Sequence, residues 1–177
     1  MTGILCAGIT NASSASDASV SPESFLEVDK AITVNKALPK QAEERARIIV
    51  DIFSDPKVAS YNLSGSDIGD NDIAAVFKGL VQREIRSDKE LKNNRVQIRL
   101  LDISQDNVSR VGVANLLKLL QNGAVVDEGK KENKKIFPDV RGTIMKVSSG
   151  VDYTEELLTE WMHFASSVFA GGLRIVE

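Results

Sequence analysis

The chain has one histidine, His163, and acid–base or metal chemistry would be sought there first. Glu160 precedes it by three positions, a spacing that places a carboxylate and an imidazole on one helix face, as in helical carboxylate–histidine metal pairs. A di-iron site of that kind needs a second histidine, which the chain lacks. His163 also lies opposite the apolar stripe of its expected helix, beside Glu156. We therefore interpret it as a solvent-facing imidazole.

The single cysteine, Cys6, excludes an intramolecular disulfide, which fits a reducing compartment. A catalytic cysteine needs a positioned base, and the only histidine lies far away in the sequence. Small residues surround Cys6, so we expect an inert thiol. With no paired nucleophile and base and no cofactor fingerprint, we predict a protein that is not an enzyme and binds no cofactor and no metal.

The glycine- and acid-rich segment 64–72, "SGSDIGDND", suggests a phosphate loop or a calcium loop. No Gly-Lys-Ser/Thr follows the glycines, so the lysine of a phosphate loop is missing. A calcium loop counted from Asp67 has Asp72 where glycine is required and Lys78 where the bidentate glutamate belongs. We therefore predict that Asp70 to Asp72 cap the following helix, where the helix dipole favours acids.

Polar residues alternate with apolar ones in "RVQIRLLDIS", which predicts a strand over 95–103, with a helix as the less favoured alternative. On a strand, both arginines project from one face, about 13 Å apart. Such a ribbon could bind a nucleic-acid backbone without reading bases. An ordinary solvated face, its arginines paired with acids, is the favoured alternative because the net charge is −3. The candidate nucleic-acid contacts are Arg95, Gln97, Arg99, Lys92 and Arg86.

A second basic cluster, "KKENKK" at 130–135, stands in a charged segment next to a glycine. Charge runs of this kind usually stay solvated. We expect a solubilising loop, with contact to phosphate or to an acidic partner as the alternative.

The elements that must position these residues are predicted from periodicity. Apolar stripes at helical spacing and cap signals predict helices over 22–32, 39–55, 72–88, 104–123 and 152–172. A short strand is expected within 141–150, and no internal repeat is evident. The fold class we predict is mainly α, a bundle of about five helices with a small β-hairpin or short strands; an α+β domain also fits. Residues 1–20 and 173–177 are expected to be extended arms flanking one helical domain, 21–172.

Bulk composition narrows the function further. The 177 residues are 42% hydrophobic, enough for a core, while the net charge excludes a global basic field for DNA or an anionic membrane. No apolar run approaches the roughly 20 residues of a membrane span, and we expect no membrane partner. The N-terminus lacks the basic region of a classical signal peptide. We expect a cytoplasmic location, or a particle or virion assembled inside a cell.

The Ser/Ala-rich arm before Val20 has little apolar content to hold it on its own domain. If it is ordered, a neighbouring subunit is the simplest holder. We therefore expect a non-enzymatic structural subunit that self-assembles into a filament or a capsid-like particle of the viral coat or nucleocapsid type. Its partners would be copies of itself and, as a candidate, single-stranded nucleic acid. The alternative is a monomeric helical adaptor that docks a protein through an apolar helix face. Candidate assembly contacts are Ile4, Leu5, Ile9, Val20, Leu173, Ile175 and Val176.

Overall fold

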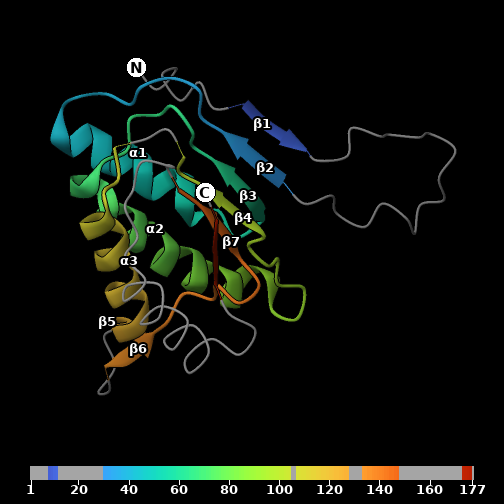
Figure 1. Cartoon of the computed structure of the whole chain (residues 1–177). Coiled ribbons are helices and arrows are strands. Elements are labelled where there is room, and N and C mark those ends of the chain that lie inside the picture. The colour runs from blue at the N-terminus through green and yellow to red at the C-terminus, as the bar shows by residue number, and fades with distance from the viewer. Residues whose placement is uncertain (1–7, 12–29, 105–106, 128–132, 148–172, 177) are drawn as a thin grey trace, which may run out of the picture.

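The computed structural model describes residues 8–11, 30–104, 107–127, 133–147 and 173–176. Within these ranges the chain forms an α/β fold with one six-stranded sheet and a separate two-stranded ribbon (Figure 1). The helices are α1 (Ala42–Ser54), α2 (Ile73–Arg86) and α3 (Arg110–Asn122), with the short turns η3 (Asp70–Asp72) and η4 (Ser87–Leu91) flanking α2. The strands are β1 (Gly8–Asn11), β2 (Lys30–Thr33), β3 (Val58–Asn62), β4 (Leu100–Asp102), β5 (Ala124–Val126), β6 (Lys134–Ile136), β7 (Ile144–Lys146) and β8 (Arg174–Val176).

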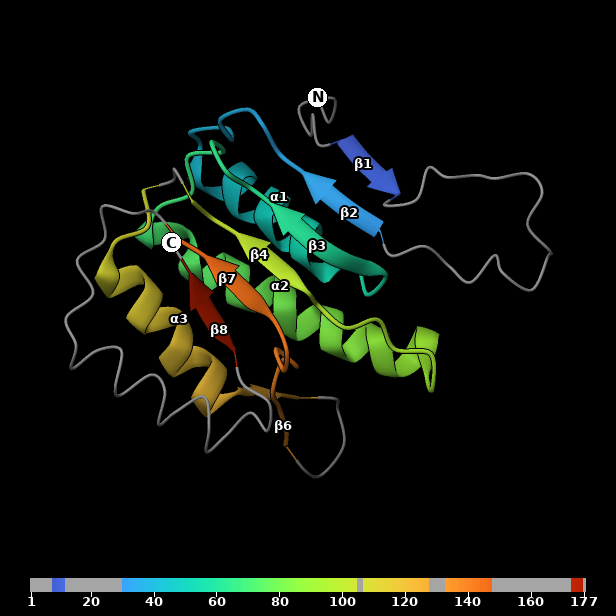
Figure 2. The same cartoon turned by 45° about the vertical axis from the view of Figure 1, so that its right-hand side comes forward.

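The large sheet keeps the order of the chain. Strands β2, β3, β4, β7 and β8 lie side by side and parallel, and β1 pairs antiparallel with β2 at one edge. Parallel neighbours need crossover connections, which are right-handed, so consecutive crossovers in one direction put their helices on the same face. Figure 2 shows α1, α2 and α3 in a row on one side of the sheet.

One row of residues that are register partners across the sheet faces the helices. Ile32, Tyr61, Leu101 and Met145 are direct neighbours across four strands, and all four are buried; Ile175 continues the row and is partly buried. The core lies between this row and the apolar stripes of the three helices. The Phe53 ring of α1 packs against the Tyr61 ring with centroids 4.7 Å apart, which joins the helix layer to the sheet.

The chain contains an internal repeat that the sequence analysis missed. Residues 58–80 and 98–120 are equivalent at an offset of 40: each runs through a strand, a loop and a helix. Because a single such unit cannot bury its own apolar face, stacking the units builds the core. Matched buried pairs are Val58 and Ile98, Leu63 and Ile103, Ile68 and Val108, Ile73 and Val113, Val76 and Leu116, and Leu80 and Leu120.

The predicted mainly α bundle is therefore wrong. Most strands are three or four residues long, and a short apolar run cannot be told from a piece of buried helix by periodicity. The predicted helix 22–32 is contradicted at its end, where Lys30–Thr33 forms β2. Helices within 39–55, 72–88 and 104–123 are confirmed as α1, α2 and α3, and β7 confirms the strand within 141–150. The helix predicted over 152–172 lies outside the described residues.

The two predicted arms contribute strands to the domain's own sheet. Within 1–20, the described residues Gly8–Asn11 form β1, and Ile9 is the register partner of Ile32. At the other end, β8 pairs with β7, and Leu173 before it is buried in the core. Ile4, Leu5 and Val20 lie outside the described residues.

Candidate functional site

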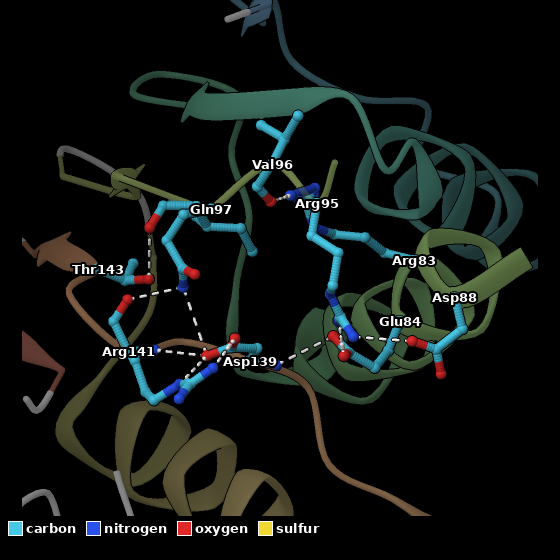
Figure 3. A network of polar contacts seen from close by, with 10 residues as sticks. Arg83, Glu84, Asp88, Arg95, Val96, Gln97, Asp139, Arg141 and Thr143 are labelled. Carbon is cyan, nitrogen blue, oxygen red and sulfur yellow. Dashed lines mark hydrogen bonds and ion pairs between the residues drawn. The ribbon is translucent and has the colours of Figure 1, made fainter. Parts of the chain in front are cut away.

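A polar pocket lies at the amino ends of β4 and β7 (Figure 3). Three stretches of chain meet there: the end of α2 with the start of η4, the extended segment 95–97 that precedes β4, and residues 139–141 that precede β7. The space is about 160 Å³. Its walls are formed by Arg83, Glu84, Ser87, Arg95, Val96, Gln97, Asp139 and Arg141.

Arg83 forms the deepest wall of the pocket and is only 4% exposed. Its Nη1 donates to the carbonyl oxygens of Val58 at 2.9 Å and Asp55 at 3.1 Å, and lies 3.4 Å from the Tyr61 hydroxyl. Its Nη2 donates to the Val96 carbonyl at 2.7 Å. The guanidinium thus ties the start of β3 to the segment before β4 through carbonyl dipoles, without a carboxylate among these acceptors.

Burial sets the electrostatics of this pair. Burial lowers the pKa of the Arg83 guanidinium, and the charge interaction with Tyr61, which acts to raise that pKa, offsets only part of the shift. Burial also raises the pKa of the Tyr61 hydroxyl, which the charge of Arg83 partly offsets. Tyr61 is therefore a neutral hydroxyl at physiological pH.

Arg95 closes one side of the pocket. Its Nη2 pairs with Glu84 on α2, and its Nη1 pairs with Asp88 on η4 at 2.7 Å. The second oxygen of Glu84 accepts from the backbone N–H of Asp139 at 3.2 Å. Glu84 thereby connects the segment before β4 to the segment before β7.

Asp139 and Arg141 close the opposite side. Arg141 binds the Asp139 carboxylate with two hydrogen bonds, from Nε at 2.9 Å and from Nη2 at 2.8 Å. Gln97 donates to the Arg141 carbonyl at 2.7 Å and approaches the same carboxylate at 3.4 Å. Burial alone would raise the pKa of Asp139, but hydrogen bonds from Arg141 and Gln97 outweigh it and hold that pKa below its ordinary value.

This arrangement suits binding more than bond-making. It offers guanidinium and amide donors, one serine hydroxyl and two carboxylates that are already hydrogen-bonded. A nucleophile would need a base within hydrogen-bond reach, and none of the contacts around Ser87 supplies one. His163 and Cys6 lie outside the described residues. Within those residues no cluster of three or more histidine, cysteine or acidic side chains is arranged to hold a metal ion.

The structure brings two of the five candidate nucleic-acid residues into this pocket, Arg95 and Gln97. Arg86 lies outside its walls and binds Glu90 at 2.8 Å, and Lys92 is exposed in the turn after η4. Arg99 is exposed too, and its backbone bridges the neighbouring strands. Only part of the predicted strand 95–103 is a strand, Leu100–Asp102, because 95–97 leave the sheet to meet α2 and the 139–141 segment.

Six lining residues were missed: Arg83, Glu84, Ser87, Val96, Asp139 and Arg141. The sequence carries a signal for the first of these. Arg83 follows Leu80 by three positions and Val76 by seven, so it continues the apolar stripe of α2, and a lone arginine on such a stripe needs buried acceptors.

The acidic loop 64–72 supplies no side-chain cap to α2 itself, but Asp72 caps the turn η3 that leads into α2. The Asp72 carboxylate accepts from Gly69 N–H and from Arg45 of α1, both at 2.8 Å. Asp70 accepts from the backbone N–H of Ser109 at 2.7 Å, at the start of α3. The loop therefore links all three helices at the carboxyl end of the sheet.

No protein-family model matches the chain, and no curated protein sequence or solved structure shows detectable similarity to it. Among the described helices, none has the length and apolar character needed to cross a membrane.

Proposed function

We propose that the protein is a non-enzymatic structural subunit that associates with copies of itself, and that strand β5 forms the contact. The observation that carries this proposal is an uncharged, exposed strand: β5 reads Ala-Val-Val, and its central Val125 is 63% exposed. Within the described residues β5 pairs only with β6, and its other edge has no partner strand among them. An exposed apolar strand edge is a template for pairing with another chain.

The ribbon is anchored on one face and presented to solvent on the other. Ala124 is the register partner of Ile136, which is buried in the core. Val125 is the partner of Lys135, and residues directly opposite lie on the same face. Phe137 is 45% exposed, and the Lys135 ammonium lies 5.8 Å from its ring centre. The outer face thus offers an apolar surface with a single cation above it.

The charges on the two strands indicate which edge of the ribbon pairs with a second copy. A two-fold contact between two β6 strands would bring Lys134 and Lys135 of the two copies together, and like charges in cross-strand positions are destabilising. A two-fold antiparallel contact between two β5 strands instead juxtaposes valine and alanine side chains. Identical patches facing each other are the usual geometry of homodimers, so β5 against β5 is the favoured contact.

A filament or particle needs a second contact, because a two-fold interface closes on itself. Among the described residues β8 is an edge strand of the large sheet, and its outer edge is the candidate. The Arg174 N–H donates to the Thr143 carbonyl, and the Val176 carbonyl accepts from the Val147 N–H, so both residues bond toward β7. The N–H and C=O of Ile175, which lies between them, therefore point away from β7. A nucleic-acid backbone is not part of the proposed partners, because Glu84 and Asp88 already bind Arg95 and Glu90 binds Arg86.

Light scattering coupled to size-exclusion chromatography tests the proposal over a range of protein concentrations. The unaltered chain should be a dimer or larger, and Val125→Lys should be a monomer because it places two ammonium groups at the contact. Val111→Lys is the matched control, since Val111 is a 62% exposed valine on α3, away from the ribbon. A strict monomer for the unaltered chain, or equal masses for both variants, would refute the β5 contact. The first of these results would favour a monomeric adaptor.

A further inference from the structure

We infer that the pocket between α2 and the segments 95–97 and 139–141 is a binding site for a small monocarboxylate. This inference is independent of the proposed self-association, because the pocket and the β5 edge share no residue. It stands on the pocket's free donors, its charge and its size.

Two donor groups in the pocket walls have no partner among the described residues. Arg83 uses Nη1 and one hydrogen of Nη2 for its carbonyl and Tyr61 contacts, which leaves Nε and the second Nη2 hydrogen unused. The Ser87 hydroxyl also has no hydrogen-bond partner in the described part of the chain, although Ser87 is buried, with only 3% of its surface exposed. Among the described residues, Arg83 Nε and Ser87 Oγ are not completely enclosed, and both residues line the pocket. An arginine fork and a hydroxyl together match the two oxygens of a carboxylate.

The charge of the walls limits the ligand to one negative charge. Three guanidinium groups, of Arg83, Arg95 and Arg141, face two carboxylates, of Glu84 and Asp139, so the lining has one positive charge in excess. Asp88 binds Arg95 from outside the lining, so with Asp88 included the nearby charges balance. A monoanion can use the free donors of Arg83. A dianion such as hydrogen phosphate would be repelled by the fixed carboxylates, because like charges at short range are unfavourable.

The size of the space limits the ligand to a small molecule. About 160 Å³ is close to the volume of roughly 150 Å³ that holds benzene in an engineered protein cavity. The lining is mostly polar, and Val96 contributes its carbonyl oxygen, which accepts from Arg83. A carboxylate group at Arg83 with two or three carbons beyond it fits this volume.

Sodium butyrate is the probe, titrated against the isotopically labelled full chain with backbone amide shifts as the readout. Chloride keeps the ionic strength constant, and inorganic phosphate is titrated separately. Butyrate should give saturable shifts confined to the amides around Ser87, Arg95–Gln97 and 139–141. Phosphate should give weaker or no saturable shifts at these amides. Ser87→Ala should raise the butyrate Kd about tenfold, the size expected for one hydrogen bond to a charged group.

Arg86→Ala is the matched control, since Arg86 is an exposed arginine one residue from Ser87 that does not line the pocket, and its butyrate Kd should stay unchanged. Arg141→Ala provides a second pocket variant at an exposed side chain and should also weaken binding. Shifts that never saturate, that chloride reproduces, or that persist unchanged in both pocket variants would overturn the site. Phosphate binding as tight as butyrate binding would overturn the assignment to a monocarboxylate.

Discussion

Replacing Gly79 by alanine tests how the helix layer is packed. Gly79 lies in the middle of α2 and is buried against α1. A Cβ at this position would lie 2.6 Å from the Phe53 Cβ, 2.9 Å from the Val50 carbonyl oxygen and 3.2 Å from the Val50 Cα. Carbon atoms pack best at about 3.5–4.0 Å. Because the obstructing atoms belong to the backbone or to a Cβ, no side-chain rotation relieves the contact, and the two helices must separate.

The magnitude follows from two opposing effects. Alanine is favoured over glycine inside a helix by about 1 kcal/mol. Overpacking a well-filled core costs about 1–3 kcal/mol, and the rigid neighbours put this site at the upper end. Separation would also loosen Phe53, which is fully buried and packs on Tyr61. We therefore expect Gly79→Ala to lower the free energy of unfolding by about 1–2 kcal/mol, measured by urea denaturation followed by circular dichroism.

Gln82 provides the matched control, because it is exposed on the same helix three residues later. Only helix propensity acts there, so Gln82→Ala should be more stable than Gln82→Gly by about 1 kcal/mol. The preference between glycine and alanine is then opposite at the two positions. If Gly79→Ala were as stable as the unaltered chain or more stable, the close contact between α1 and α2 would not be a determinant of this fold.

Two further predictions concern the pocket and the ribbon. Hydrogen bonds from Arg141 and Gln97 outweigh burial and lower the pKa of Asp139, so its stabilising contribution is complete above the ordinary carboxyl pKa near 4 and is lost as the pH falls through the lower folded value. Asp139→Asn should therefore flatten the decline of the urea midpoint below about pH 4, and an unchanged decline would contradict this assignment. Gly123 has φ +67°, and a Cβ there would lie 2.8 Å from the Ile136 carbonyl oxygen, so Gly123→Ala should speed amide exchange in β5 and β6. Gly142→Ala is the control: Gly142 has a similar φ of +72° but open space around it, so this variant adds backbone strain without a steric clash. It should leave amide exchange in β5 and β6 unchanged.

Several features of this protein could be predicted from local sequence. The helices α1, α2 and α3 follow from apolar stripes at helical spacing, because burying one face of a helix requires that spacing wherever the helix packs. The repeat at an offset of 40 was also present in the sequence. Leu63 and Ser64 correspond to Ile103 and Ser104, and comparison of the two segments would have shown that 58–80 and 98–120 form the same unit.

The sheet was harder to predict. Strands of three or four residues carry too little pattern to separate them from helix ends, as Lys30–Thr33 shows. Their pairing is non-local: Tyr61 contacts Leu101 and Leu101 contacts Met145 across about 40 residues of chain each time. Such partners become neighbours only when the crossover helices have packed.

The candidate site shows the same division. The sequence alone placed Arg95 and Gln97 on an exposed face, opposite buried Ile98, because alternation of polar and apolar residues sets the side to which each points. Which groups meet them depends on the fold: Glu84 comes from the preceding helix, and Asp139 and Arg141 come from the segment before β7. Residues far apart in the chain converge there because successive units stack in register. Because of this stacking, Arg95 and Gln97, predicted to lie on a solvated strand face, line a pocket instead.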